Sequence, residues 1–102
     1  MSRRTEQIAH SIQRIVAATL ERAIEGETIV TVTRVDVAPD MKTAKVFVAN
    51  WDNLTADLQN KGLRESQQAV RNGLTSKYTP RLTIIHDDAS EYAAHIASLL
   101  KS

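Results

Sequence analysis

Two strand-like runs joined by a short Pro-Asp connection limit the folds that this chain can adopt. Residues 28–37 and 44–49 are rich in β-branched side chains, and their valines alternate with polar or charged residues. Pro39 presets the φ angle of a turn, and Asp40 can bond to its own turn backbone. Strands with so short a connection pair antiparallel. The sequence therefore predicts a β-hairpin with a covered valine face and a wetter face that carries Lys45.

A long amphipathic helix is predicted before the hairpin. Over residues 5–25 the apolar side chains recur at the spacing of one helical face, and Gly26 follows as a C-terminal cap. We expect this face to pack as core. Its members are Ile8, Ile12, Ile15, Val16, Leu20, Ala23 and Ile24.

A second helical pattern follows the hairpin, but its phase slips. The step from Leu58 to Leu63 is five residues long, near Gly62, and a polar ESQQ stretch fills the middle of the segment. We expect either one kinked helix or two short helices at an angle. The pattern ends at Gly73, because the residue before Pro80 disfavours helical backbone.

A third strand and a last helix complete the chain. Residues 81–86 form the strand, and Asp87, Asp88 and Ser90 supply turn and N-cap chemistry before a helix over residues 89–101. This order predicts an α+β two-layer sandwich with a three-stranded sheet and helices on one face. The same order occurs in the type II KH fold, a nucleic-acid-binding architecture. We expect a single domain over residues 1-102.

Amino-acid usage favours a cytoplasmic protein. The chain has no cysteine, which excludes disulfides and thiolate metal sites and suits a reducing compartment. Its N-terminus lacks the apolar segment of a signal peptide, and no apolar run approaches the length of a membrane span. We therefore expect a soluble protein with no membrane partner.

No pattern of catalytic or metal-binding residues is visible. His10, His86 and His95 fall on separate predicted elements without metal-ligand spacing. Asp87 and Asp88 are more simply a turn and cap pair than hydrolytic carboxylates. Phosphate-loop, dinucleotide and nucleophile-elbow motifs are absent. The sequence predicts a protein that is not an enzyme, with no metal, cofactor or small-molecule substrate.

Positive charge is concentrated in one stretch of the chain. Residues 61–81 contain five basic residues and one acidic residue, whereas the whole chain carries a formal net charge of +1. A basic patch on a nearly neutral domain is typical of nucleic-acid binding, although an ordinary solvated helix face is the alternative. The five basic residues are Lys61, Arg64, Arg71, Lys77 and Arg81.

Several stretches together resemble the bacterial ribosome-binding factor A family, in that family's order and over nearly the whole chain. They are the N-terminal RR with QIAHSIQRIV, the hairpin VTVTRVDVAPDMKTAKVFV, LRESQQAVRNGL, and TPRLTIIHDDASEYAAHI. The hairpin is the most specific part, because generic strand composition rarely produces V-T-x-V-x-V-x-x-D followed three residues later by A-K-V-x-V.

The resemblance implies a KH-like fold in which a kinked helix pair, built on Ala-x-Gly, replaces the G-x-x-G loop of other KH domains. Ser66, Gln67 and Gln68 occupy those positions here, and glutamine does not copy the backbone freedom of glycine. The small Ser66 suits close helix packing, and its hydroxyl can bond to backbone in a bent helix.

The resemblance also implies a function. Members of this family are non-catalytic assembly factors that bind the small (30S) ribosomal subunit and its 16S rRNA during late maturation and rRNA processing, and support growth in the cold. We expect a monomer that recognises the shape of folded RNA. The alternative is a generic KH-type single-stranded RNA-binding or protein-interaction module.

The candidate RNA-binding residues extend beyond the basic stretch. Two N-terminal arginines are expected to form a mobile arm that orders on RNA. The hairpin contributes two exposed lysines, and the helix bend contributes polar side chains that can bond to riboses or bases. These further candidates are Arg3, Arg4, Lys42, Lys45, Ser66, Gln67 and Gln68.

Overall fold

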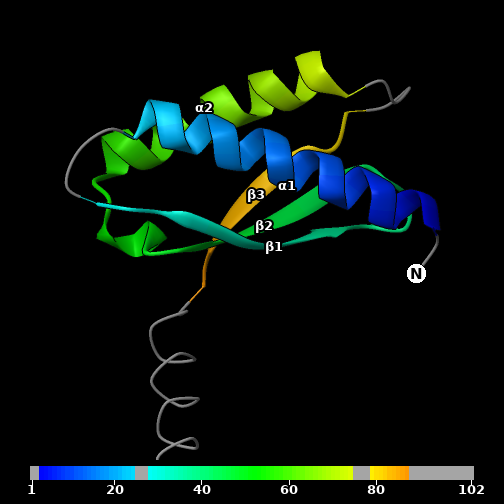
Figure 1. Cartoon of the computed structure of the whole chain (residues 1–102), viewed down its shortest axis with the longest axis horizontal. Helices are drawn as coiled ribbons and strands as arrows, with labels where there is room; N and C mark the ends of the chain where they lie inside the picture. The colour runs from blue at the N-terminus through cyan, green and yellow to red at the C-terminus, as the bar shows by residue number, and fades with distance from the viewer. Residues whose placement is uncertain (1–2, 25–27, 75–78, 88–102) are drawn as a thin grey trace, which may run out of the picture.

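The computed structural model has two helices packed on one face of a three-stranded sheet (Figure 1). It describes residues 3–24, 28–74 and 79–87. The elements are α1 (Arg3–Ala23), β1 (Thr31–Val37), β2 (Thr43–Ala49), the 3-10 turn η1 (Trp51–Asn53), α2 (Ala56–Gly73) and β3 (Arg81–Asp87). The strand order is β1-β2-β3, with β1 antiparallel and β3 parallel to the central β2. The predicted α+β two-layer sandwich is confirmed.

Some predictions fall outside the described residues. These are the C-terminal helix over residues 89–101, the cap at Gly26, the turn residues Asp88 and Ser90, and the positions of Lys77 and His95. Within the described helices, none is long and apolar enough to cross a bilayer.

The predicted hairpin is confirmed in pairing, turn and burial. The backbone N–H of Lys42 donates to Asp40 Oδ1 at 3.0 Å, which closes the turn, and Met41 takes a positive φ of 62° there. Lys45 is exposed on the opposite face, as predicted. The valine face is buried: Val35, Val37, Ala44, Val46 and Val48.

β1 departs from regular pairing at one position. The register between β1 and β2 shifts between Val32 and Arg34, so Thr33 is the extra residue of a bulge. Its hydroxyl donates to the Asp87 carboxylate at the end of β3. This contact joins the two outer strands of the sheet, which gives Asp87 a structural role.

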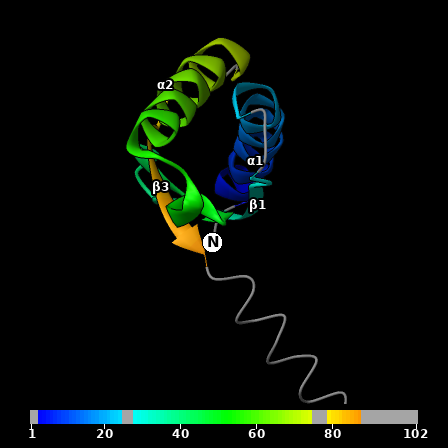
Figure 2. The ribbon, with the colours of Figure 1, turned by 90° about the vertical axis from the view of Figure 1, so that its left-hand side faces the viewer.

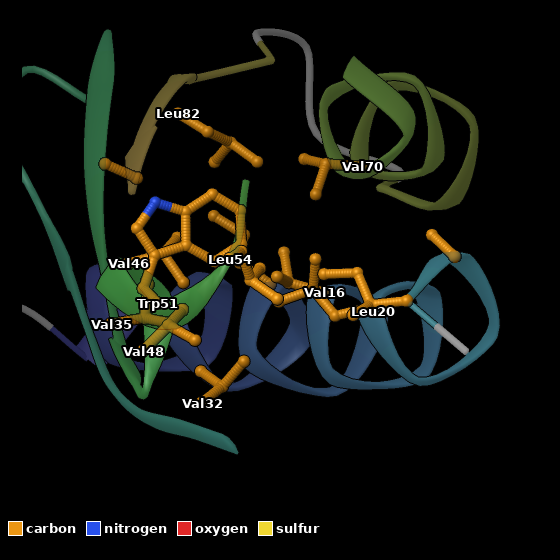
Figure 3. Close-up of a cluster of buried hydrophobic side chains, with 14 of the residues drawn as sticks. Val16, Leu20, Val32, Val35, Val46, Val48, Trp51, Leu54, Val70 and Leu82 are labelled. Atoms are coloured by element: carbon orange, nitrogen blue, oxygen red, sulfur yellow. The ribbon is translucent and has the colours of Figure 1, made fainter. Parts of the chain in front are cut away.

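The core lies between the helices and the sheet, and it is aliphatic except for Trp51. Figure 3 shows Val16 and Leu20 of α1 and Val70 of α2 meeting the sheet valines around the indole of Trp51. Trp51 begins η1 and is buried, because this short turn directs its large apolar ring inward.

Helix α2 is one continuous helix, so the alternative of two separate helices is wrong. It begins at a Thr55 cap, whose hydroxyl accepts from the Leu58 N–H at 3.3 Å. Its buried face consists of Gly62, Ser66 and Val70, at helical spacing of four residues. The apparent phase slip arose because two of these three inward positions carry small residues that hydrophobic periodicity does not mark.

Close packing of α2 on α1 explains the small residues. A Cβ atom built at Gly62 would lie 3.0 Å from Leu20 Cδ2 and 3.1 Å from Trp51 Cη2. One built at Gly73 would lie 2.9 Å from Ile15 Cδ1. The two helices therefore touch through glycine at two points along α2, and this fixes the direction in which the outer face of α2 points.

Candidate nucleic-acid interface

Three arginines from two elements line one groove between α2 and the start of β3. Arg64 and Arg71 are seven residues apart on α2, two helical turns, so they share a flank of the helix. Arg81 is the first residue of β3, which lies beneath α2 when the molecule is viewed end on (Figure 2). All three side chains are exposed. The groove has a volume of about 460 Å³, with Leu63 and Leu82 among its lining residues.

Gln67 fixes the backbone on both sides of Arg81. Its amide Nε2 donates to the Pro80 carbonyl oxygen at 3.0 Å, and its Oε1 accepts from the Leu82 N–H at 2.8 Å. On the other edge of the strand, the Arg81 N–H donates to the Lys42 carbonyl oxygen at 2.9 Å. The backbone that carries Arg81 is thus held from α2 and from the hairpin. The Gln67 amide is occupied by these bonds.

Ser66 is a packing residue. Its side chain is 0% exposed, so it cannot touch RNA in this conformation. The expected bond from its hydroxyl to backbone is also absent, because Oγ has no hydrogen-bond partner among the described residues. Ser66 lies between Gly62 and Val70 on the buried face of α2, where a small side chain allows close packing.

Lys61 and Gln68 lie on other parts of the exposed side of α2. Lys61 lines a separate groove between the two helices, together with Arg22 of α1. Gln68 lines both this groove and the arginine groove. The basic stretch predicted as one patch is therefore divided by the crest of α2. Arg22 was not among the predicted residues, because it precedes the hairpin in the chain and only the packing of α1 on α2 brings it near Lys61.

The other predicted cations that the structure describes lie outside both grooves. Arg3 and Arg4 form the first turn of α1, so the prediction of a mobile arm at these residues is wrong. Lys42 lies in the hairpin turn, and Lys45 pairs in register with Asp36 and Thr83 on the outer side of the sheet. All four are exposed, and their contact with RNA stays a prediction.

No described carboxylate forms an ion pair with the cations of either groove. The ion pairs within residues 3–24, 28–74 and 79–87 are Arg34–Asp36 at 3.4 Å and His86–Asp52 at 3.9 Å, the latter only with a protonated histidine. Arg34 also lies over the Phe47 ring, 4.2 Å from its centroid. Arg34 is thus engaged on the sheet, whereas the groove cations stay available for an anionic ligand.

His86 has a structural contact. Its Nδ1 accepts from the Asp52 N–H at 3.2 Å, which joins the end of β3 to η1. His10 is exposed on α1. In the part of the chain that the structure describes, no three His, Asp or Glu side chains gather into a set that could hold a metal ion.

Sequence comparison relates the chain to one family. A family profile described as ribosome-binding factor A matches residues 4–100. Proteins of that name from Frankia casuarinae and Akkermansia muciniphila are 34% and 33% identical to this chain. The alignments cover 95% and 99% of this chain, and 62% and 85% of those proteins.

Structure comparison supports the same fold. A solution NMR structure of a candidate ribosome-binding factor A from Thermotoga maritima aligns with a TM-score of 0.68 at 18% identity, over 86% of this chain and 91% of that one. The crystal structure of ribosome-binding factor A from Thermus thermophilus aligns with a TM-score of 0.63 at 17% identity, over 80% and 93%. At these identities the likeness concerns the fold alone.

Proposed function

This chain belongs to the ribosome-binding factor A family, and we propose that it is a non-catalytic assembly factor that binds the small (30S) ribosomal subunit. The proposed ligand within the subunit is 16S rRNA, and the proposed stage is late maturation with rRNA processing in the cytoplasm, with a contribution to growth in the cold. Family membership supports the coarser statement that the protein is a ribosome-binding assembly factor.

The arginine groove is the observation that supports RNA as the ligand. Arg64, Arg71 and Arg81 line one groove, and no described carboxylate pairs with them. The guanidinium group is planar and always charged, and its donors match the geometry of phosphate oxygens. Three such groups along one groove are suited to a run of backbone phosphates.

A factor of this kind acts through differential affinity. It needs contacts that form with one arrangement of a folded RNA and not with another, and it then shifts the subunit toward the arrangement it binds. Phosphate contacts from a rigid scaffold meet this need without reading base sequence. Gln67 contributes to the rigidity, since it holds the backbone of Arg81 against α2.

Co-sedimentation with purified small subunits tests the proposal. The double variant Arg64→Glu/Arg71→Glu should lose most of its binding, and wild-type binding should fall steeply with salt because released counterions drive the association. Arg14→Glu is the control for the single reversals Arg64→Glu and Arg71→Glu, since Arg14 is exposed on α1 and lines a groove on the β1 side. Absence of binding by the wild-type protein would refute the proposed function, and unchanged binding by the double variant would show that the arginine groove is not the contact.

The alternative of a generic single-strand-binding module makes a different prediction. Such modules stack bases on aromatic side chains, and no aromatic residue is among the described residues that line the arginine groove. A short unstructured oligonucleotide should therefore bind much more weakly than small subunits. Equal affinity for the two would favour the alternative.

A further inference from the structure

A second cationic groove follows the seam between α1 and α2. It has a volume of about 330 Å³, and Ala23 and Ala69 are among its lining residues. Arg22 of α1 and Lys61 of α2 line it and are exposed, and neither pairs with a described carboxylate. Glu65 also lines this groove, so the net positive charge of the groove is smaller than that of the arginine groove.

The two grooves border one exposed helical ridge. Gln68 lines both, so it marks the crest of α2 between them. The arginine groove is lined by residues of α2 and β3, and the seam groove by residues of α2 and α1. Figure 2 shows that α1 and β3 lie on different sides of α2. Asn60 borders the first and Asn72 borders the second, so amide groups accompany the cations on both flanks.

We propose that this ridge binds in the minor groove of double-helical RNA, with the cations of each flank on one of the two phosphate backbones. This inference rests on the proposed function and specifies its ligand. An α-helix with its side chains is about 10–12 Å across, and the minor groove of A-form RNA is wide, shallow and accessible to side chains. The amides of Gln68, Asn60 and Asn72 can both donate and accept, which suits the 2′-hydroxyls exposed in that groove.

The composition of the ridge disfavours other nucleic acids. Single strands are bound by stacking their bases on aromatic rings, and the described residues lining the two grooves include none. The minor groove of B-form DNA is only about 6 Å wide, too narrow for a helix, and its major groove admits a helix but offers no 2′-hydroxyl groups to the amides. A helical ridge with Gln68 at its crest, and with amides and cations on both flanks, therefore fits duplex RNA better than single-stranded RNA, and the 2′-hydroxyls distinguish duplex RNA from duplex DNA.

Fluorescence anisotropy with three probes tests the inference. The probes are a mixed-sequence RNA duplex of about 20 base pairs, one strand of it alone, and the DNA duplex of the same sequence, a length that exceeds the roughly 16 base pairs spanned by other duplex-RNA binders. The protein should bind the RNA duplex on the order of tenfold more tightly than either other probe. Equal or tighter binding to the single strand or to DNA would overturn the inference.

Salt titrations then count the phosphate contacts of each flank. The plot of log affinity against log salt has a negative slope. Arg22→Gln and Lys61→Gln should each reduce the magnitude of this slope by about 1, as should Arg64→Gln and Arg71→Gln. Arg14→Gln should leave the slope unchanged. Circular dichroism would verify that each variant is folded, which is expected because all five side chains are exposed.

The failure of this inference can be distinguished from failure of the proposed function. If Arg22→Gln and Lys61→Gln keep the wild-type slope while Arg64→Gln and Arg71→Gln lower it, the seam groove is not a contact and the ridge inference is wrong, with the proposed function intact. If the wild-type protein itself does not co-sediment with small subunits, the proposed function is wrong as well.

Discussion

The side-chain oxygen of Gln67 accepts a hydrogen bond from the backbone N–H of Leu82 at 2.8 Å. Together with the bond from its Nε2 to the Pro80 carbonyl, this makes the amide behave like a short piece of neighbouring strand at the edge of β3. A side chain on α2 therefore completes the backbone pairing where the sheet has no further described strand.

The first prediction concerns this amide. Gln67→Glu removes the N–H that donates to Pro80 and brings a carboxylate oxygen near that carbonyl. We expect the free energy of unfolding to fall by about 1–3 kcal/mol, because a part-buried acceptor loses its partner. Urea denaturation measures the change. Gln68→Glu, at an exposed site on the same helix, should stay within about 0.5 kcal/mol of wild type, and equal losses for both would contradict the assignment.

The second prediction concerns the contact between the helices. Gly62→Ala should destabilise the protein, because its new methyl would lie 3.0 Å from Leu20 and 3.1 Å from Trp51. Overpacking costs about 1–3 kcal/mol, and the gain in helix propensity offsets about 1 kcal/mol of it. Thermal denaturation measures the change in stability. In the same experiment Asn60→Ala, on the exposed side of α2, should be neutral or slightly stabilising. A Gly62→Ala variant more stable than wild type would show that the helices can separate without cost.

The third prediction concerns Ser66. Its Oγ is buried without a partner among the described residues, and an unsatisfied buried hydroxyl costs about 1–3 kcal/mol. Ser66→Ala should therefore raise the free energy of unfolding by about 1 kcal/mol and leave the affinity for small subunits unchanged. Chemical denaturation and co-sedimentation measure the two effects. A destabilised variant would mean that the hydroxyl has a partner in solution.

The fourth prediction separates the side chain of Arg81 from its backbone. Arg81→Gln keeps the N–H that donates to Lys42 at 2.9 Å, so stability should change by less than about 0.5 kcal/mol. Affinity for small subunits should nevertheless fall, by roughly 1–3 kcal/mol in binding free energy for a lost charged hydrogen bond. Binding measured by sedimentation beside Arg14→Gln checks this. If the two variants bind alike, Arg81 is not a contact.

Much of the fold could be predicted because its signals are local. The alternating valines and the Pro39-Asp40 turn specify the hairpin with little help from the rest of the chain, and α1 carries a full apolar stripe. Helix α2 was harder to interpret. Its buried face is made by Gly62, Ser66 and Val70, and a face with two small residues is visible only when the partner helix is known.

The candidate site was predicted less completely, because proximity along the chain is a poor guide to proximity in space. A window over residues 61–81 merges Lys61 with Arg64, although they line different grooves. The same window omits Arg22, which α1 brings beside Lys61. The role of Gln67 had no sequence signal, since a glutamine on a polar stretch of helix is usually expected to face water.

The buried indole gives the protein its own optical reporter. Trp51 is the single tryptophan of the chain, and it lies where η1, α2 and the sheet meet. Its emission should shift to longer wavelength when α2 lifts away from the sheet, even if the hairpin stays paired. A ligand that binds only to the outer flanks of α2 should leave the emission maximum of Trp51 unchanged. A ligand that separates the helices from the sheet should shift this maximum, so the change can be followed without an added dye.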